Sequence, residues 1–332
     1  MEVKQIVLVN RPIGLPSKDD FRTETITLPE LKNDEVLIKA KYFSVDPYMR
    51  GRMNDAKSYV PPYKIDEPIA GAGIGEIIET KSSDLKVGDF VQGHFPWTTE
   101  SVQKASSVKK IDTKLAPAPY YLGILGMPGL TAYFGLLHIG KPKEGETVVI
   151  SGAAGAVGIV VGQIAKIKGC RVVGIAGSDE KINMLKNDFH FDEVINYKTT
   201  SDMKKAVKDS SPNDVDIYFD NVGGSISDAV IANINFHARI VLCGQISLYN
   251  TTEVPTGPRL QPMLLTRSAL MQGFIVGNFK DHFSEGIEQL SQWVKDGKLK
   301  YKETIVEGFE KLPEAFLGLF SGENKGKMVV KV

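Results

Sequence analysis

The stretch that decides the fold is "TVVISGAAGAVGIVVGQIA", residues 147–165. It opens with a short run of β-branched residues, which is typical of a buried strand, and a turn of small residues follows. After the turn, apolar side chains recur at the spacing of one helix face. These side chains are Val157, Val160, Val161, Ile164 and Ile167. The order predicts a strand, a tight turn and a helix that begins near Ala156.

The turn carries glycine at positions 152, 155 and 158, with Ala153 and Ala154 between the first two. The common dinucleotide fingerprint is G-x-G-x-x-G, so this spacing is a variant of it. Small residues let a ligand approach the backbone, and the following helix points the positive end of its dipole at an anion. Gly158 would let the helix pack closely on the strand. The turn therefore predicts a pyrophosphate site, and a purely structural turn is the alternative.

Downstream of this unit, short apolar runs alternate with helix-like segments up to residue 295. The runs are "RVVGIAG" (171–177), "DEVINY" (192–197), "VDIYFDNVG" (215–223), "RIVLCGQIS" (239–247) and "ALMQGFIVG" (269–277). Continuous apolar runs indicate strands that are covered on both faces. Their alternation with helices predicts an α/β domain over residues 121–295, built on a doubly wound parallel sheet.

Residues 1–120 have a different pattern of residue types, which indicates a second domain. Strand-forming residues there are broken by Gly, Pro and Asp, as in "EVLIKAKYFSV" (35–45), "PIAGAGIGEIIET" (68–80) and "DFVQGHF" (89–95). The last stretch ends in "GKMVVKV" (326–332), which reads as a strand that rejoins the first domain. We therefore expect a β-rich domain over residues 1–120, completed by residues 296–332.

The end of the second predicted strand bears on the choice of cofactor. Sites for NAD carry an Asp or Glu about 20 residues after the glycine-rich turn, where it bonds the ribose 2′-hydroxyl. Here Gly177 and Ser178 stand at that place, and Lys181 follows one helical turn later. A missing acid with a nearby cation suits a 2′-phosphate and predicts NADPH. The alternative for Lys181 is a solvated charge on a helix.

Composition bounds the function. The 332 residues carry 40 basic and 40 acidic side chains, so no nucleic-acid or anionic-membrane partner is expected. No apolar run is long enough for a membrane span or a signal peptide. Cys170 and Cys243 show no framework spacing, which fits a reducing, cytoplasmic location. The sequon at 250–252 is then a chance match.

The histidines give no sign of a metal site. They stand at positions 94, 138, 190, 237 and 282, and no two are three or four residues apart. Metal sites need clustered Cys, His and carboxylate ligands. No zinc is predicted, although a site assembled from dispersed residues stays open.

Several stretches together resemble a known family. They are "KVGDFVQG", "MPGLTAYFGL", "SGAAGAVG", "GSDEK", "INYK", "FDNVGG", "CGQIS" followed by Tyr249, and "ENKGKMVVKV". In this combination the chain resembles the zinc-independent medium-chain dehydrogenases/reductases. Within them it is similar to the prostaglandin reductase branch, with its NADPH-dependent curcumin reductases and alkenal double-bond reductases. The resemblance covers nearly the whole chain and implies a GroES-like domain beside a Rossmann domain. The Gly-His-Glu motif, the early cysteine ligand and the Cys-rich lobe of zinc-dependent members are absent.

The resemblance also implies roles for matched residues. Those assigned to NADPH binding are Thr131, Gly155, Ala156, Val157, Gly158, Lys181, Tyr197, Asn221, Cys243, Gly244, Tyr249, Phe274, Ile275, Val276 and Asn324. Core packing is the alternative for Cys243 and Phe274, and Asp220 beside Asn221 could be a turn residue.

The implied activity is reduction of the C=C bond of α,β-unsaturated ketones or aldehydes by hydride transfer to the β-carbon. Tyr249 would donate a hydrogen bond to the developing oxyanion, with loop packing as its alternative. Tyr48 and Arg50 are candidates for substrate contact, and Arg50 and Arg52 could equally be surface charges. A quinone reductase and a non-enzymatic NADPH-binding protein remain open as other functions. A homodimer is expected, because "ALMQGFIVG" reads as an apolar strand at the sheet edge.

Overall fold

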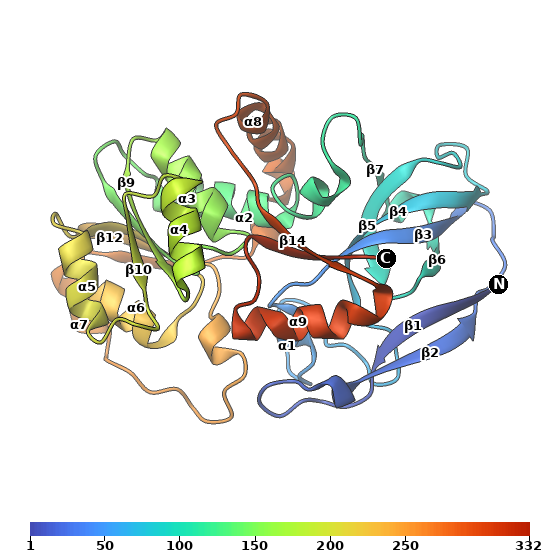
Figure 1. The fold of residues 1–332 in the computed structure, drawn as a ribbon, viewed down its shortest axis with the longest axis horizontal. Coiled ribbons are helices and arrows are strands. Elements are labelled where there is room, and N and C mark those ends of the chain that lie inside the picture. The colour runs from blue at the N-terminus through green and yellow to red at the C-terminus, as the bar shows by residue number, and fades with distance from the viewer. The chain divides into compact units, whose positions relative to one another are not determined.

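The computed structural model describes residues 1–332, and the chain divides into two compact units (Figure 1). Unit 1 comprises Met1–Leu122, Glu303–Asn324 and Met328–Val332. Unit 2 comprises Gly123–Lys302 together with the short segment Lys325–Lys327. The sequence places the boundaries at 120 and 295. Only the resemblance, through the cofactor role implied for Asn324, points to a return of the last segment toward unit 2.

Unit 2 is built on a six-stranded sheet in the order β10-β9-β8-β11-β12-β13, and every neighbouring pair is parallel. The strands are β8 (Thr147–Ser151), β9 (Arg171–Ala176), β10 (Glu193–Asn196), β11 (Val215–Asp220), β12 (Ile234–Leu242) and β13 (Leu270–Gly273). The chain runs outward from β8 to β10, returns to the other side of β8, and runs outward again to β13. This is the doubly wound order, and it confirms the predicted fold class.

The helices of unit 2 cover this sheet (Figure 1). They are α2 (Met127–Phe134), α3 (Gly158–Ile167), α4 (Asp179–Asn187), α5 (Met203–Ser210), α6 (Gly224–Ile231), α7 (Gln261–Thr266) and α8 (Phe283–Lys295). Helix α3 packs on β8 and β9, and α6 packs on β8 and β11. One apolar cluster joins Val149, Val173 and Tyr218 of the sheet to α5, α6 and α7. None of the helices has both the length and the apolarity needed to cross a bilayer.

Two expected elements differ from the structure. Helix α3 begins at Gly158 and not near Ala156, because the preceding residues form tight turns, with the Gly155 N–H bonded to the Gly152 carbonyl at 3.0 Å. The run "ALMQGFIVG" is a strand only over Leu270–Gly273. The Asn278 side chain accepts the Ile275 N–H at 2.9 Å, and a 3₁₀ helix follows over Val276–His282. A local side-chain bond therefore replaces the sheet ladder there.

Unit 1 is antiparallel and β-rich. Its main strands are β3 (Glu35–Ser44), β4 (Ala70–Thr80), β5 (Phe90–Pro96), β6 (Glu100–Lys104), β7 (Lys109–Lys110), β14 (Glu303–Glu307) and β15 (Lys327–Lys331). β1 (Glu2–Leu8) and β2 (Phe21–Thr27) form a separate pair, and the helices are α1 (Met49–Arg52) and α9 (Leu312–Ser321). The C-terminal β15 pairs with β3, with Val329 opposite Ser44. Phe43, Trp97 and Phe316 lie in the core beneath.

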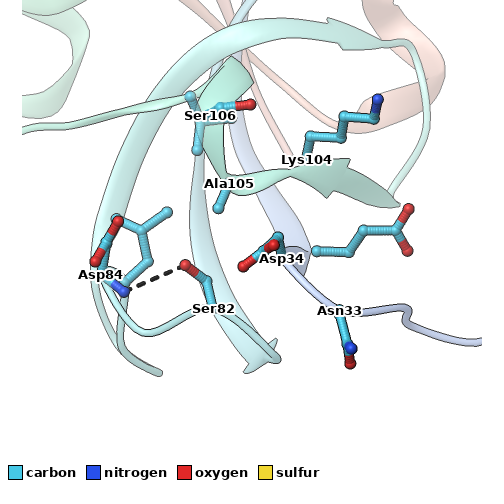
Figure 2. A pocket seen from close by; sticks show the side chains of 10 residues that line it. Asn33, Asp34, Ser82, Asp84, Lys104, Ala105 and Ser106 are labelled. Carbon is cyan, nitrogen blue, oxygen red and sulfur yellow. Dashed lines mark hydrogen bonds between the residues drawn. The ribbon is translucent and has the colours of Figure 1, made fainter.

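A surface hollow of unit 1 lies among the turn before β3, the β4–β5 connection and the residues after β6 (Figure 2). Its lining is Asn33, Asp34, Glu35, Ser82, Asp84, Leu85, Lys104, Ala105, Ser106 and Val108. The Asp84 N–H is bonded to Ser82 Oγ at 3.2 Å, so part of the wall is an ordinary turn. None of the residues assigned to cofactor or substrate lies here.

Candidate functional site

The candidate site lies at the point where the strand order of unit 2 reverses. β8 and β11 are neighbours there, and the chain leaves them in opposite directions along the sheet. Such a switch point leaves a crevice at the carboxyl ends of the strands, where ligands of doubly wound sheets bind. The turn at residues 152–157 follows β8, and Asn221 follows β11. The sequence thus brings both of these predicted parts of the site to one place.

Gly158 fastens the helix to the turn. A Cβ placed on Gly158 would lie 2.5 Å from the Gly152 carbonyl oxygen and 2.7 Å from the Ala153 Cα. Both are backbone atoms, which cannot move aside as the tip of a side chain can. The close packing predicted for Gly158 is confirmed, and it holds the N-terminus of α3 against the turn.

Asp220 organises the loops around the crevice. Its carboxyl group is fully buried and accepts five hydrogen bonds. The donors come from β8, from β11 and the turn that follows it, and from the loop after β12. The donors are Ser151 Oγ (2.9 Å), Tyr218 Oη (2.8 Å), the Val222 N–H (3.0 Å), the Gly223 N–H (2.9 Å) and Gln245 Nε2 (3.1 Å). A buried carboxyl group needs hydrogen-bond partners, and these five donors supply them. The turn role of Asp220 is therefore the one that the structure shows. Ser151 was not identified from the sequence. Gln245 falls within the range 243–249 that the resemblance assigns to the nicotinamide pocket, but its bond to Asp220 was not predicted.

Two predicted cofactor residues are held by the scaffold. Asn221 donates its Nδ2 to the Ser151 carbonyl at 2.8 Å and its backbone N–H to Ser151 Oγ at 2.9 Å, so it ties β11 to β8. The Thr131 hydroxyl donates to the Met127 carbonyl at 2.7 Å within α2. The Thr131 oxygen can still accept a hydrogen bond, but its proton is engaged. The cofactor roles of both stay predictions.

Lysines lie near the end of β9, together with the two acidic residues Asp179 and Glu180 that open α4. A Cβ on Gly177 would lie 2.7 Å from the Tyr197 ring, so the missing side chain makes room for that ring. Ser178 caps α4 by accepting the Lys181 N–H at 3.3 Å. The pKa of Lys181 is lowered, first by burial and then by the positive charges of Lys198 and Lys325. Cations therefore gather where an NAD site has an acid, and neither Lys198 nor Lys325 was identified from the sequence.

The segment after Asn324 returns to the phosphate turn. Asn324 is the last residue of this part of unit 1, and residues 325–327 belong to unit 2. The Gly326 N–H donates to the Ala154 carbonyl at 2.8 Å, and Gly326 forms a parallel bridge with Gly155. "ENKGK" is thus attached to the turn through Gly326, while the predicted role of Asn324 itself stays a prediction.

Tyr249 is half-buried in the loop after β12, and its hydroxyl is oriented by the backbone. The Gln245 N–H donates to Tyr249 Oη at 3.2 Å. Since the phenol oxygen is the acceptor in this bond, the phenol proton can point toward another group. Burial raises the pKa of Tyr249, although the bond from Gln245 opposes this effect. The arrangement suits a neutral hydrogen-bond donor.

The other residues assigned to the nicotinamide pocket are packed into the scaffold. Burial raises the pKa of the Cys243 thiol to about 12, so it remains protonated. The Phe274 ring makes edge contacts with Phe219 and Phe279 at centroid distances of 6.5 and 6.2 Å. The core alternative for Phe274 is therefore the one that the packing shows, while Ile275 is 39% exposed.

The residues of unit 1 that were considered for substrate contact have different surroundings, and Arg50 has a structural role. Arg50 is 3% exposed, so its reading as a surface charge is wrong. Its guanidinium donates to the carbonyls of Pro12 and Gly14 and to Asn54 Oδ1, which assigns it to holding the N-terminal loop.

Arg52 lies over the Tyr63 ring, with its Cζ 4.0 Å from the ring centroid. It also donates to the Pro61 carbonyl at 3.0 Å. Burial and the nearby Asp46 raise the pKa of Tyr48, so this phenol stays neutral. The substrate role of Tyr48 stays a prediction.

Relatives match over nearly the full chain. The Bacillus subtilis protein YfmJ, whose name assigns it provisionally to the NADP-dependent oxidoreductases, is 60% identical over 99% of this chain and 97% of its own length. The NADPH-dependent curcumin reductase of Escherichia coli is 41% identical over 98% and 96%. The NADP(+)-dependent 2-alkenal reductase of Nicotiana tabacum is 43% identical over 99% and 97%. The crystal structure of CurA from Vibrio vulnificus in complex with NADPH superimposes with a TM-score of 0.94, at 42% identity and 99% coverage of both chains.

Two family models match the chain. "N-terminal domain of oxidoreductase" covers residues 4–111, and "Zinc-binding dehydrogenase" covers residues 156–294. No three His, Cys, Asp or Glu side chains of the chain stand together in a way that could hold a metal ion. The side chains present therefore do not fit a zinc site, which needs three or four such ligands.

The two family models and the solved structure agree with the doubly wound sheet and the β-rich unit 1. The chain belongs to the medium-chain dehydrogenase/reductase superfamily, in the branch of the prostaglandin, curcumin and 2-alkenal reductases.

Proposed function

We propose that the chain is an NADPH-dependent reductase of the C=C bond of α,β-unsaturated aldehydes and ketones. The observation that carries the proposal is the phosphate turn at residues 152–158 together with the end of β9, where Gly177 stands in place of the acid of an NAD site and Lys181 follows in α4. The relatives named for NADPH-dependent curcumin and 2-alkenal reduction support the same reaction.

The turn and α3 would hold the pyrophosphate of the cofactor. The helix presents its N-terminus there, and Gly158 keeps the backbone close. Lys181 would pair with the 2′-phosphate, and the Tyr197 ring, 41% exposed beside Gly177, would contact the adenosine end. A charge-assisted bond to a phosphate is stronger than a neutral hydrogen bond, so this end sets the preference for NADPH over NADH.

When bound, NADPH supplies the hydride that adds to the β-carbon of the alkene. The protein has to stabilise the negative charge that develops on the carbonyl oxygen. We assign this to the Tyr249 hydroxyl, because its oxygen accepts from the Gln245 N–H and its proton can be donated. A proton then has to reach the α-carbon to complete the reduction.

The experiment is a panel of enals, enones and quinones, assayed by NADPH consumption with the unmodified protein and with Tyr249→Phe. We expect turnover of enals and enones, and a tenfold to thousandfold drop in both kcat and kcat/KM for the variant. NADPH affinity, measured by fluorescence titration, should change little. Turnover of quinones alone would replace the proposal with a quinone reductase, and binding without turnover would indicate a non-enzymatic role.

A further inference from the structure

One cation near the proposed 2′-phosphate end comes from a distant part of the sequence. Lys325 Nζ lies 2.5 Å from Glu180 Oε1, and Glu180 precedes Lys181 in the first turn of α4. The Lys325 side chain is 35% exposed, so solvent and a ligand can reach it. The C-terminal segment therefore delivers a positive charge to the helix that carries Lys181.

The backbone on either side of this lysine is fixed. The Gly326 N–H bonds the Ala154 carbonyl at 2.8 Å, and the Lys327 N–H bonds the Lys302 carbonyl at 3.0 Å. A Cβ on Gly326 would lie 1.9 Å from the Lys302 carbonyl oxygen, so the backbone packs here as closely as only a glycine allows. Lys325 thus has its main chain at the phosphate turn and its ammonium at the start of α4.

This path is the one that a phosphorylated adenosine would follow. In a doubly wound site the pyrophosphate lies at the glycine-rich turn, and the adenosine ribose lies toward the end of the second strand. Lys325 spans the same interval between the turn and α4. Burial lowers the pKa of Lys181, and the positive charges of Lys198 and Lys325 lower it further. A dianionic phosphate would offset the repulsion among these three lysines.

We propose that Lys325 is a further determinant of cofactor specificity, which contacts the 2′-phosphate of NADPH from the C-terminal segment while Glu180 holds its ammonium over the site. This inference rests on the proposed function, since it assumes that NADPH is the cofactor. It adds a residue to the proposed site that is 144 positions from Lys181 in the chain (325 − 181 = 144).

The test compares NADPH, NADH, adenosine 2′,5′-bisphosphate and AMP as ligands of the apoprotein, by fluorescence or calorimetric titration at low salt. Lys325→Met should raise the Kd of NADPH and of the bisphosphate about three- to tenfold and leave the Kd of NADH and AMP unchanged. Lys325→Arg should bind all four ligands as the unmodified protein does. The dependence of log Kd for NADPH on log salt should become shallower in Lys325→Met.

A matched control removes a different lysine of the same region. Lys186→Met lies on α4 and loses only an exposed pair with Glu193 at 3.8 Å, so it should leave the NADPH-to-NADH ratio unchanged. Thermal unfolding of each apoprotein shows whether the variants are folded. An equal change in the affinity for NADPH and NADH, or no change in either, would overturn the role of Lys325.

The two proposals fail in different ways. In one outcome the unmodified protein prefers NADPH and reduces enals, while Lys325→Met leaves every Kd unchanged. The role proposed for Lys325 is then wrong, and the proposed function stands. If Lys325→Met loses NADPH selectively but no alkene is turned over, the inference holds and the proposed reaction is wrong. An unmodified protein that binds both cofactors equally contradicts both.

Discussion

At the scale of single residues, Lys181 is the side chain that bears most directly on cofactor preference. Lys181→Ala removes the proposed phosphate contact, which is worth roughly 1.5–3 kcal/mol. We expect the KM for NADPH to rise about ten- to hundredfold while the KM for NADH stays nearly the same. Steady-state kinetics with both cofactors measures this. Equal use of the two cofactors by the unmodified protein would contradict the assignment.

The protonation state of Tyr249 predicts how kcat declines at high pH. Its pKa is raised above the ordinary value of 10.0, chiefly by burial. A raised pKa means that the phenol keeps its proton to higher pH, so the donor is present throughout the neutral and mildly alkaline range. We expect any decline of kcat caused by Tyr249 to fall above pH 10. A limb that persists unchanged in Tyr249→Phe would belong to another group.

Some single residues could not be placed from sequence because their roles depend on partners far along the chain. The sequence identified Lys181 and Tyr249, whose neighbours in the chain form recognisable motifs. Asp220 was left between two roles, since its partners Ser151 and Gln245 come from other strands. Arg50 was predicted to be either a substrate contact or a surface charge, but its guanidinium donates to carbonyls of the N-terminal loop.

At the scale of elements, the contact between the phosphate turn and α3 is the most sensitive to change. Gly158→Ala places a Cβ 2.5 Å from the Gly152 carbonyl oxygen, so the helix must move away from the turn. Overpacking of this kind costs roughly 1–3 kcal/mol of unfolding free energy. Denaturant unfolding should show this loss, and titration should show weaker NADPH binding.

A glycine in open space supplies the control for this substitution. Gly51 lies in α1 and has no atom within 4 Å of the position of a Cβ. Gly51→Ala should therefore keep or slightly raise the unfolding free energy, because alanine favours helix. If Gly158→Ala proved as stable as Gly51→Ala, the close contact between the turn and α3 would not be a constraint.

The elements that sequence predicts best are those whose pattern is set by burial alone. The apolar runs of β8, β9 and β11 are covered on both faces, and each was located from its composition. The start of α3 lies two residues after the predicted one, because Ala156 and Val157 belong to the turn although alanine favours helix. β13 was read too long because the side chain of Asn278 takes the N–H of Ile275, a contact that apolar patterning does not record.

At the scale of the whole molecule, the chain crosses between its units more often than composition suggests. The boundary near residue 120 is visible in the sequence because the two parts differ over many residues. The part before it is rich in strand-forming residues, and the part after it alternates short apolar runs with helix-like segments. The return of residues 325–327 to unit 2 involves only three residues, one of them a glycine. Its cause is the backbone bond from Gly326 to Ala154, and a single backbone bond has no signature in sequence.

Self-association is the last expectation, and it belongs to the free edge of the sheet in unit 2. β13 is hydrogen-bonded to β12 on one side and ends the strand order on the other. Leu270 of β13 is 49% exposed, and Phe236 of the neighbouring strand β12 is 61% exposed. An uncovered apolar edge invites pairing with a second copy. We therefore expect a two-fold homodimer in which the β13 edges meet.

Light scattering at micromolar concentration measures the assembly, since a dimer has twice the 36.4 kDa mass of the chain. Leu270→Asp puts a charge on the edge and should shift the protein toward the monomer, because burying an unpaired carboxylate at an interface is costly. Leu115→Asp, which alters a leucine of unit 1 that is 69% exposed, should leave the mass at the dimer value. A monomeric mass for the unmodified protein would contradict the predicted dimer and show that the β13 edge stays exposed to solvent. Loss of the dimer in both variants would not support an interface at the β13 edge, because Leu115 is not part of β13.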